Sequence, residues 1–254
     1  MIFIAPNQKG GVGKSTFQNQ IMSAYLHSKS NKKVRLIEID DENEDSIVFT
    51  KTEILDAKIM HTSEIRKLDE IFYEKDDIVI DVGGNKTSTI LLEEVKKIGE
   101  FENITWFIPM GSGEMDSTNA LSVYEEIMEM NEKAKVIFIL SNAKTDDEKW
   151  EFMNFFGSDF LDIEFAILDH IPTAKHITIK NSTVINHARF SHKTFLDLAL
   201  DETDYRAEYK ALKKDKKDED ASKKLKLRRL KNEAIEYLEY LKIDVFPKLD
   251  ELLK

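Results

Sequence analysis

The chain has 254 residues, of which 41% are hydrophobic and 33% are charged. This length favours a single large α/β domain, although two small domains would also fit. The chain contains no cysteine, which excludes disulfide frameworks, cysteine-ligated zinc, iron–sulfur clusters and a cysteine nucleophile. No apolar run approaches the length of about 20 residues that a membrane-spanning helix needs, so we expect a cytoplasmic protein without a signal peptide.

The net charge of −11 is unevenly distributed along the chain. Residues 1–200 hold 22 basic and 34 acidic side chains, whereas residues 210–231 hold 11 basic and 4 acidic ones. The acidic part does not attract polyanions, but the late basic segment can contact them. The charge balance therefore does not exclude nucleic acid as a partner.

Short apolar runs alternate with amphipathic stretches over the first 200 residues. We expect strands at residues 2–5, 34–39, 78–82, 104–108, 136–140 and 163–168, and helices at residues 15–27, 63–74, 88–98, 117–130 and 146–156. The nearly continuous apolar character of the runs is typical of strands that are buried on both faces. The alternation predicts an α/β fold, with a mostly parallel twisted sheet flanked by helices on both faces.

After residue 200 the sequence predicts only helices, and we treat residues 201–254 as a helical C-terminal extension of the 1–200 domain. The charged stretch KKDKKDEDASKK (residues 213–224) has no apolar anchor, so we expect an exposed loop or a solvated helix end. An apolar stripe at helical spacing follows, made of Leu227, Leu230, Ala234, Tyr237 and Leu241. The stripe either packs against the protein's own sheet-flanking helices or forms a seam with a partner helix.

The segment Q-K-G-G-V-G-K-S-T (residues 8–16) directly follows the first expected strand and opens the first helix. A glycine-rich turn in this setting directs backbone N–H groups and a helix N-terminus at an anion. Gly10, Gly11, Val12 and Gly13 would wrap phosphate oxygens. Lys14 can reach the β- and γ-phosphates, the Ser15 hydroxyl can bind Mg²⁺, and Thr16 can donate to the α-phosphate.

The loop departs from the ordinary P-loop pattern G-x-x-x-x-G-K-[ST], whose first position falls on Gln8. It reads K-G-G-x-G-K-[ST] instead, with a second lysine, Lys9, at its start. This form resembles the deviant Walker A motif of the ParA/MinD superfamily of P-loop ATPases. The resemblance implies ATP and Mg²⁺ as cofactors and a homodimer that forms on ATP binding. It also implies that Lys9 contacts the nucleotide of the facing subunit and acts in catalysis with Lys14.

Two further strand ends can be compared with that superfamily. Partition ATPases carry D-x-D-P-Q after the second strand. Here Asp40 matches the second aspartate, while Glu38 replaces the first and Asp41-Glu42 replace Pro-Gln. The resemblance gives Asp40 the catalytic role of orienting the attacking water and supporting Mg²⁺. A carboxylate at the carboxyl end of a parallel strand also lies at the edge where ligands bind.

The stretch D-D-I-V-I-D-V-G-G (residues 76–84) is typical of a Walker B strand, in which Asp81 can hold a Mg²⁺-bound water. Gly83 and Gly84 permit a switch whose amides sense the γ-phosphate. Many ParA proteins have D-x-P-P here. The D-V-G-G form is more similar to ParA-like ATPases of plasmid stability and conjugative transfer.

Weaker signals lie farther along the chain. The resemblance offers Asn142 as an adenine contact, with a strand-end turn as the alternative, and Pro172 as part of the base pocket. Four histidines, His170, His176, His187 and His192, have spacings that fit no zinc motif, so a zinc site is disfavoured.

We therefore expect a slow, partner-stimulated ATPase that acts as a molecular switch in DNA segregation, plasmid stability or conjugation. Its partner would be a small DNA-binding or conjugation protein, and nonspecific DNA binding would place it on the nucleoid. The candidate DNA surface comprises Lys223, Lys224, Lys226, Arg228, Arg229 and Lys231. The alternative is a MinD-like positioning ATPase that binds no DNA. Membrane attachment is disfavoured because residues 246–254 are short, contain Pro247 and are not strongly basic.

Overall fold

The structure is a computed structural model that describes the chain except residues 8, 42–48, 75, 85 and 100. A seven-stranded sheet has the strand order β3-β2-β4-β1-β5-β6-β7, and each described pair of neighbouring strands is parallel. The strands are β1 (Ile2–Ala5), β2 (Val34–Ile39), β3 (Leu55–Met60), β4 (Ile78–Val82), β5 (Ile104–Met110), β6 (Lys135–Ala143) and β7 (Lys175–Lys180). The predicted α/β fold with a parallel sheet is confirmed.

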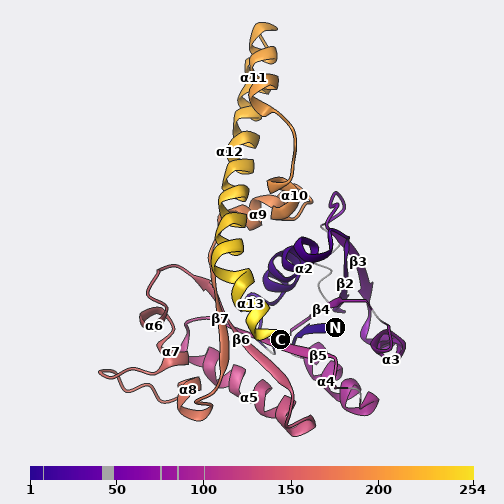
Figure 1. The fold of residues 1–254 in the computed structure, drawn as a ribbon, viewed down its shortest axis with the longest axis vertical. Helices are drawn as coiled ribbons and strands as arrows, with labels where there is room; N and C mark the ends of the chain where they lie inside the picture. Colours follow the sequence, from indigo (N-terminus) through magenta and orange to yellow (C-terminus); the bar gives the residue numbers. More distant parts are fainter. Residues whose placement is uncertain (8, 42–48, 75, 85, 100) are drawn as a thin grey trace.

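Alternate side chains of each central strand enter two separate cores. In β1, Phe3 and Ala5 belong to one buried cluster, whereas Ile2 and Ile4 belong to the other. The period of two residues along a strand produces this division, because successive side chains point to opposite faces. Helices cover both faces of the sheet (Figure 1).

The first core is covered by the N-terminal and C-terminal helices, and the second by the helices between them. Over the first core lie α1 (Lys14–Thr16), η1 (Phe17–Met22), α2 (Ser23–Ser30), α9 (Thr183–Phe190), α10 (Phe195–Ala199), α12 (Asp218–Tyr240), η4 (Leu241–Val245) and α13 (Phe246–Leu252). Over the second core lie η3 (Thr62–Lys67), α3 (Leu68–Phe72), α4 (Lys86–Ile98), α5 (Glu114–Met130), α7 (Met153–Phe156) and α8 (Ile167–His170). The short helix α6 (Glu148–Glu151) joins β6 to α7.

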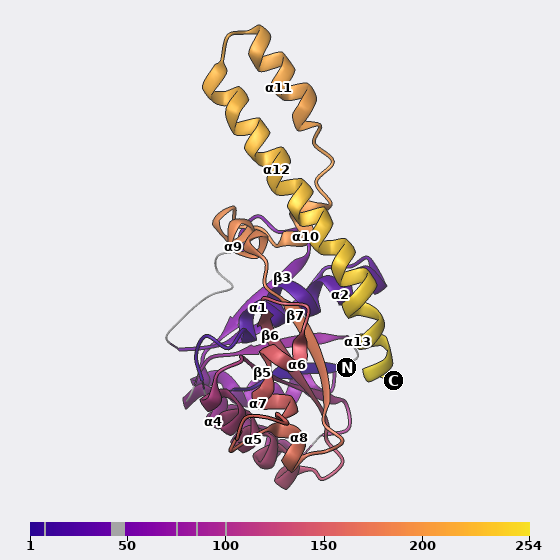
Figure 2. The ribbon, with the colours of Figure 1, turned by 90° about the vertical axis from the view of Figure 1, so that its left-hand side faces the viewer.

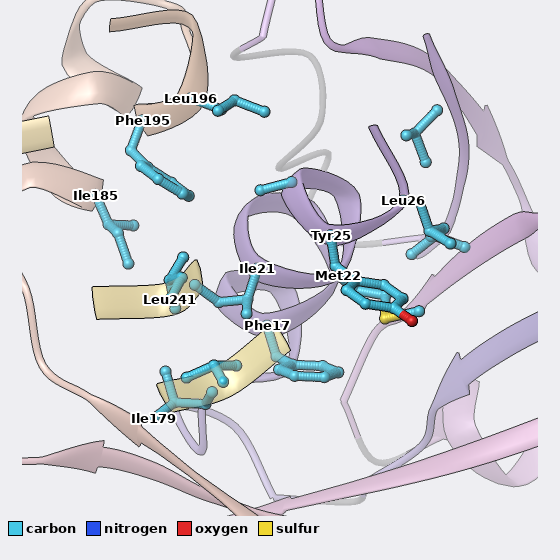
Figure 3. Packing of buried hydrophobic residues seen from close by; sticks show 14 of the residues in the cluster. Phe17, Ile21, Met22, Tyr25, Leu26, Ile179, Ile185, Phe195, Leu196 and Leu241 are labelled. Carbon is cyan, nitrogen blue, oxygen red and sulfur yellow. The ribbon is translucent and has the colours of Figure 1, made fainter. Parts of the chain in front are cut away.

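The apolar stripe of the C-terminal extension packs within the protein itself. Ala234, Tyr237 and Leu241 are buried in the first core, and Leu230 packs against it. Figure 3 shows Leu241 in the same cluster of buried side chains as Ile21 of the first helix and Ile179 of β7. The expectation of an internal contact is confirmed for these residues, whereas Leu227 at the far end of the stripe remains 37% exposed.

Two helices of the extension form a hairpin that projects from the body (Figures 1 and 2). They are α11 (Tyr205–Lys214) and the first half of α12. The charged stretch at residues 213–224 forms the end of α11, the turn and the start of α12. Within it Ala221 is buried and Lys224 is half-buried, and the other side chains are exposed. A solvated helix end was one of the two expectations for this stretch.

The strand predicted at residues 163–168 is wrong. Those residues form a turn and the start of α8, and the corresponding strand of the sheet is β7. The strand β3 was also missed. Both missed strands lie at the edges of the sheet, where one face is partly exposed, so their residues alternate between buried and exposed. The predicted helices at residues 63–74 and 146–156 are each broken into two short helices.

The last helix, α13, is held in the protein's own core. Phe246 and Leu249 are buried, and the ring of Phe246 lies 5.5 Å from that of Tyr25. A membrane contact through this helix would require these side chains to leave the core. In the part of the chain that the structure describes, no helix has the length and apolar character to cross a membrane.

Candidate functional site

The glycine-rich loop connects β1 to α1 at the carboxyl edge of the sheet. Gly11 and Gly13 have φ angles of 78° and 92°, in the left-handed region that glycine adopts without strain. The helix begins with a hydrogen bond of 2.8 Å from the Phe17 N–H to the Gly13 carbonyl. Residues 10–13 line one side of a pocket of about 380 Å³. The backbone therefore has the form of an anion-binding turn.

Lys14 lies at the base of this loop, and it is only 7% exposed. Its ammonium group donates a hydrogen bond of 2.9 Å to the carbonyl of Lys9, within the loop itself. Burial lowers the pKa of Lys14, while the carboxylates of Asp81 and Asp40 act in the opposite direction. This buried ammonium group lies near both the glycine-rich loop and two carboxylates. It can bind a phosphate oxygen, and the carboxylates can bind a metal ion that accompanies the phosphate.

Asp81 lies in β4 and is 1% exposed. Both of its carboxylate oxygens are buried, and the Ser15 hydroxyl and the Asn19 amide approach them without a well-formed hydrogen bond among the described residues. Burial raises the pKa of this carboxyl to about 7, against the opposing effect of the Ser15 hydroxyl. Two buried oxygens that are only weakly satisfied are an incomplete polar site, and a hard cation such as Mg²⁺ would complete it. The residues present therefore fit the metal that the fold implies.

Glu38 stands beside Asp81 across the sheet. The two residues are register partners in the parallel pair of β2 and β4, and both are buried. They share the face of the sheet that the first helix covers, because Leu36 and Val79, two residues before them, belong to the first core. The Glu38 carboxylate adds to the raised pKa of Asp81. Glu38 thus places a second buried carboxylate beside Asp81.

Asp40 follows β2 and is 8% exposed. Its carboxylate lies against the backbone of Gly83. A Cβ atom at Gly83 would come within 2.6 Å of the carboxyl carbon and one of its oxygens, a distance that real Cβ atoms do not adopt. The Gly83 N–H donates a hydrogen bond of 2.8 Å to the Ile39 carbonyl, which joins the two strand ends. A side chain at residue 83 would therefore displace the Asp40 carboxylate. Glu42, which the sequence comparison also singled out, lies outside the described residues, as does Gln8.

The ammonium group of Lys9 is ion-paired with the carboxylate of Asp116, in the first turn of α5. The same carboxylate accepts a hydrogen bond of 3.3 Å from the Gly113 N–H. Asn154 fixes the preceding loop by donating to the carbonyls of Gly111 and Gly113 at 2.9 and 2.8 Å. The sequence analysis did not single out Asp116. The signal available was an acidic residue in the first turn of a helix that follows a buried strand.

The ends of β6 and β7 also line the pocket. Asn142 lies near the end of β6, has a φ of 66°, is exposed and lines the pocket. The neighbouring Ser141 lies so close to Gly13 that a Cβ there would approach its hydroxyl to 3.0 Å. Pro172 does not line the pocket, because it precedes β7 instead of following a strand. Residues 179–182, at the end of β7, occupy that place instead.

The histidines lie on different elements. His176 is in β7, packed against the rings of Phe155 and Phe156 at 4.9 and 5.1 Å, and burial lowers its pKa. His170 ends α8, and His187 lies in α9. Over the described residues, no group of three or more His, Asp or Glu side chains is arranged to hold a metal ion.

The candidate DNA residues all lie in α12, on the projecting hairpin. Four of the six are engaged nearby: Lys223 with Glu219 and Asp220, Lys224 with Glu208, Arg229 with Glu233, and Lys231 with the carbonyl of Thr203. Lys226 and Arg228 are exposed and have no such partner in the described part of the chain. The hairpin projects from the body, away from α1 (Figure 2). The exposed side chains of Lys226 and Arg228 give it accessible positive charge.

Solved structures that are similar to this chain include BB_S35 and McdA. BB_S35 from Borrelia burgdorferi B31, designated a plasmid partition protein and bound to AMPPNP, matches with a TM-score of 0.50 and 19% identity. This match covers 73% of this chain and 88% of that chain. McdA from Cyanthece, in its apo form, matches with a TM-score of 0.53 and 11% identity, over 78% of this chain and 92% of that chain. No protein-family profile and no curated protein sequence matches the chain.

The chain has the ParA-like P-loop fold. This is the fold that the resemblance of the Lys9–Thr16 segment to the deviant Walker A motif implies. In a parallel sheet all carboxyl ends of strands meet at one edge, where ligands bind. The ParA-like fold therefore explains why the ends of β1, β2 and β4 bring together Lys14, Asp40 and Asp81 from distant parts of the sequence. Asn142, near the end of β6, lines the pocket beside the glycine-rich loop, and the three charged residues are not part of that pocket's lining.

Proposed function

We propose that the protein binds and hydrolyses ATP and that it works as a nucleotide-dependent dimerising switch. The observation that carries the proposal is the placement of buried Lys14 between the glycine-rich loop and the carboxylates of Asp40 and Asp81. This arrangement joins a phosphate cradle, a phosphate-binding cation and the carboxylates that water and metal need.

The chain's own residues supply most of the chemistry. The N–H groups of residues 10–13 and the Lys14 ammonium group bind the phosphate oxygens and stabilise the charge that develops on them. The Asp40 carboxylate accepts a hydrogen bond from the attacking water and orients it toward the γ-phosphorus. Lys9 of a facing subunit adds a further positive charge, so hydrolysis depends on dimerisation. Removal of such a clamp costs about three orders of magnitude in rate in related chemistry.

Ser15 and Asp81 would hold Mg²⁺, with Asp40 in support through water. When bound, the metal would neutralise negative charge on the β- and γ-phosphates. The buried Asp81 oxygens, which have no well-formed hydrogen bond among the described residues and lie near Ser15, support this assignment.

We further propose that the dimer binds DNA without sequence preference through the projecting hairpin, and that a small DNA-binding or conjugation protein stimulates hydrolysis. The excess of basic over acidic residues between positions 210 and 231 supports a polyanion contact. Lys226 and Arg228 support it most directly, because their charges are accessible.

Equilibrium titration of ATP and an assay of phosphate release, each with and without Mg²⁺, test the enzymatic part. We expect Mg²⁺-dependent hydrolysis, and loss of ATP binding by more than tenfold in Lys14→Ala. The matched control is Lys133→Ala, which removes an exposed lysine outside the site and leaves both readings unchanged. A wild-type protein that binds no ATP, or a Lys14→Ala variant that binds it normally, overturns the proposal.

A further inference from the structure

Among the described strands β7 lies at the edge of the sheet, so one side of its backbone has no neighbouring strand there. The Asn181 N–H donates a hydrogen bond of 2.8 Å to the Ala143 carbonyl of β6. Backbone groups of successive residues point to opposite sides of a strand, so those of Thr178 and Lys180 face away from β6. Exposed edge groups of this kind must be paired or covered.

A tyrosine of α12 binds the backbone groups of β7 that a neighbouring strand would bind. The Tyr240 hydroxyl accepts a hydrogen bond of 3.1 Å from the Lys180 N–H and donates one of 3.2 Å to the Thr178 carbonyl. A residue of a parallel neighbour would bond the same N–H and C=O groups. The Tyr237 hydroxyl donates to the Lys180 carbonyl at 3.2 Å. Two hydroxyls of one helix therefore satisfy the outward backbone groups at the end of β7.

Both tyrosines are held firmly in place. Tyr237 is 7% exposed, and its ring lies 5.2 Å from that of Phe195. The Lys180 ammonium group lies 5.2 Å from the centre of the Tyr240 ring, within the range of a cation–π contact. Burial raises the pKa of Tyr240 to about 12, so its hydroxyl keeps its proton and can donate at neutral pH. The hydroxyls are thus preorganised against the strand.

The strand end that they hold is one wall of the candidate nucleotide pocket. Residues 179–182 line the same pocket as the glycine-rich loop, together with Asn142. Since the loop is the proposed place for the phosphates, this part of the lining is available to the nucleoside part of a bound nucleotide. We call residues 179–182 the nucleoside wall.

We propose that Tyr237 and Tyr240 are positioning residues that hold the nucleoside wall in its binding geometry. The proposal rests on the proposed nucleotide binding. It adds that a segment of the C-terminal extension, which touches no phosphate, sets the affinity for the nucleoside part. The wall has no further strand beside it, so removal of the hydroxyls frees it to move.

Isothermal titration with Mg-ATP and with magnesium tripolyphosphate tests this assignment on the full chain. In Tyr237→Phe and Tyr240→Phe the affinity for ATP should fall by about fivefold to tenfold, as expected for lost buried hydrogen bonds. The affinity for tripolyphosphate, which has no nucleoside, should not change. The control Tyr209→Phe removes a hydroxyl from α11, away from the pocket, and should change neither value.

Unchanged ATP affinity in both variants overturns the assignment while leaving the proposed function intact. A parallel loss of tripolyphosphate affinity also overturns it, because the tyrosines would then support the fold as a whole. A wild-type protein that binds neither compound overturns the proposed function itself.

Hydrogen exchange in the wild-type protein gives a measurement that does not depend on the folding of a variant. ATP should slow exchange at the amides of residues 180–182, and tripolyphosphate should not. Equal protection by both compounds, or by neither, contradicts the assignment.

Discussion

The Lys9 ammonium group is ion-paired with the carboxylate of Asp116, within one subunit. The lysine side chain is 40% exposed, whereas the aspartate is 9% exposed. In the proposed dimer Lys9 reaches the nucleotide of the facing subunit, so this ion pair must break first. The ion pair therefore competes with dimerisation. The free energy needed to break it makes the dimer less stable relative to two separate subunits.

Substitution of Asp116 by asparagine tests this competition. Asparagine keeps an oxygen that accepts from the Gly113 N–H, so the start of α5 is preserved, but it loses the charge that holds Lys9. We expect half-maximal dimerisation at an AMPPNP concentration about threefold lower than in the wild type, since the Lys9 partner is 40% exposed and ion pairs open to solvent contribute below about 1 kcal/mol. Sedimentation velocity across an AMPPNP series measures it. A higher AMPPNP requirement would show that Asp116 supports the dimer.

Gly83→Ala should separate binding from hydrolysis. The new Cβ would collide with the Asp40 carboxylate and displace it. Because residues 10–13 and Lys14 are untouched, AMPPNP affinity should stay within about twofold. Phosphate release should fall by at least about a hundredfold, the scale of a lost general base. Normal hydrolysis in this variant would show that Asp40 does not orient the water.

Asp81→Asn should stabilise the nucleotide-free protein and abolish Mg²⁺-dependent hydrolysis. The pKa of Asp81 is about 7 in the folded protein, against an ordinary value of 3.8, so the folded state binds this proton more tightly than the unfolded state. The contribution of Asp81 to the free energy of unfolding of the wild type is therefore lost as the pH rises from about 4 to about 7.

Asparagine does not titrate, so the gain in the free energy of unfolding should grow over that pH window and level off above it. Urea titrations of both proteins at pH 4.5, 6 and 8 measure this gain. An equal gain at each pH would mean that the Asp81 carboxyl is not raised in pKa.

The DNA surface is tested by replacing Lys226, Arg228 and Arg229 together with alanine. If these residues contact phosphates, duplex affinity should fall by more than tenfold at low salt. The slope of log affinity against log salt concentration should become less steep by about 2 to 3. The matched control removes three exposed lysines elsewhere, at Lys51, Lys133 and Lys242. Unchanged retention of DNA with ATP in the hairpin variant eliminates this surface.

The sequence predicted the centre of the fold better than its edges. The runs of β1 and β4 are apolar on both faces, and this pattern alone indicates a buried parallel strand. The edge strands β3 and β7 alternate instead, and a short apolar run at residues 163–168 competed with β7 as the strand of that region. Pro172 was consequently assigned to a strand end that does not exist there.

The residues of the candidate site also differ in how well the sequence alone predicts them. The glycine-rich loop, Lys14 and Asp81 are recognisable because the phosphate chemistry fixes both residue type and local spacing. Asp116 is 107 residues from Lys9, and Tyr240 is 60 residues from Lys180. No local pattern connects such pairs, since only the packing of α5 and α12 brings them together.

ATP-dependent dimerisation through Lys9 is the central claim of this account. Sedimentation velocity with and without Mg-ATP, on the wild type, Lys9→Ala and the surface control Ser28→Ala, tests it most directly. The wild type and Ser28→Ala should change from monomer to dimer on addition of ATP, whereas Lys9→Ala should stay monomeric. Equal dimerisation of all three proteins, or no response of the wild type to ATP, would contradict the claim.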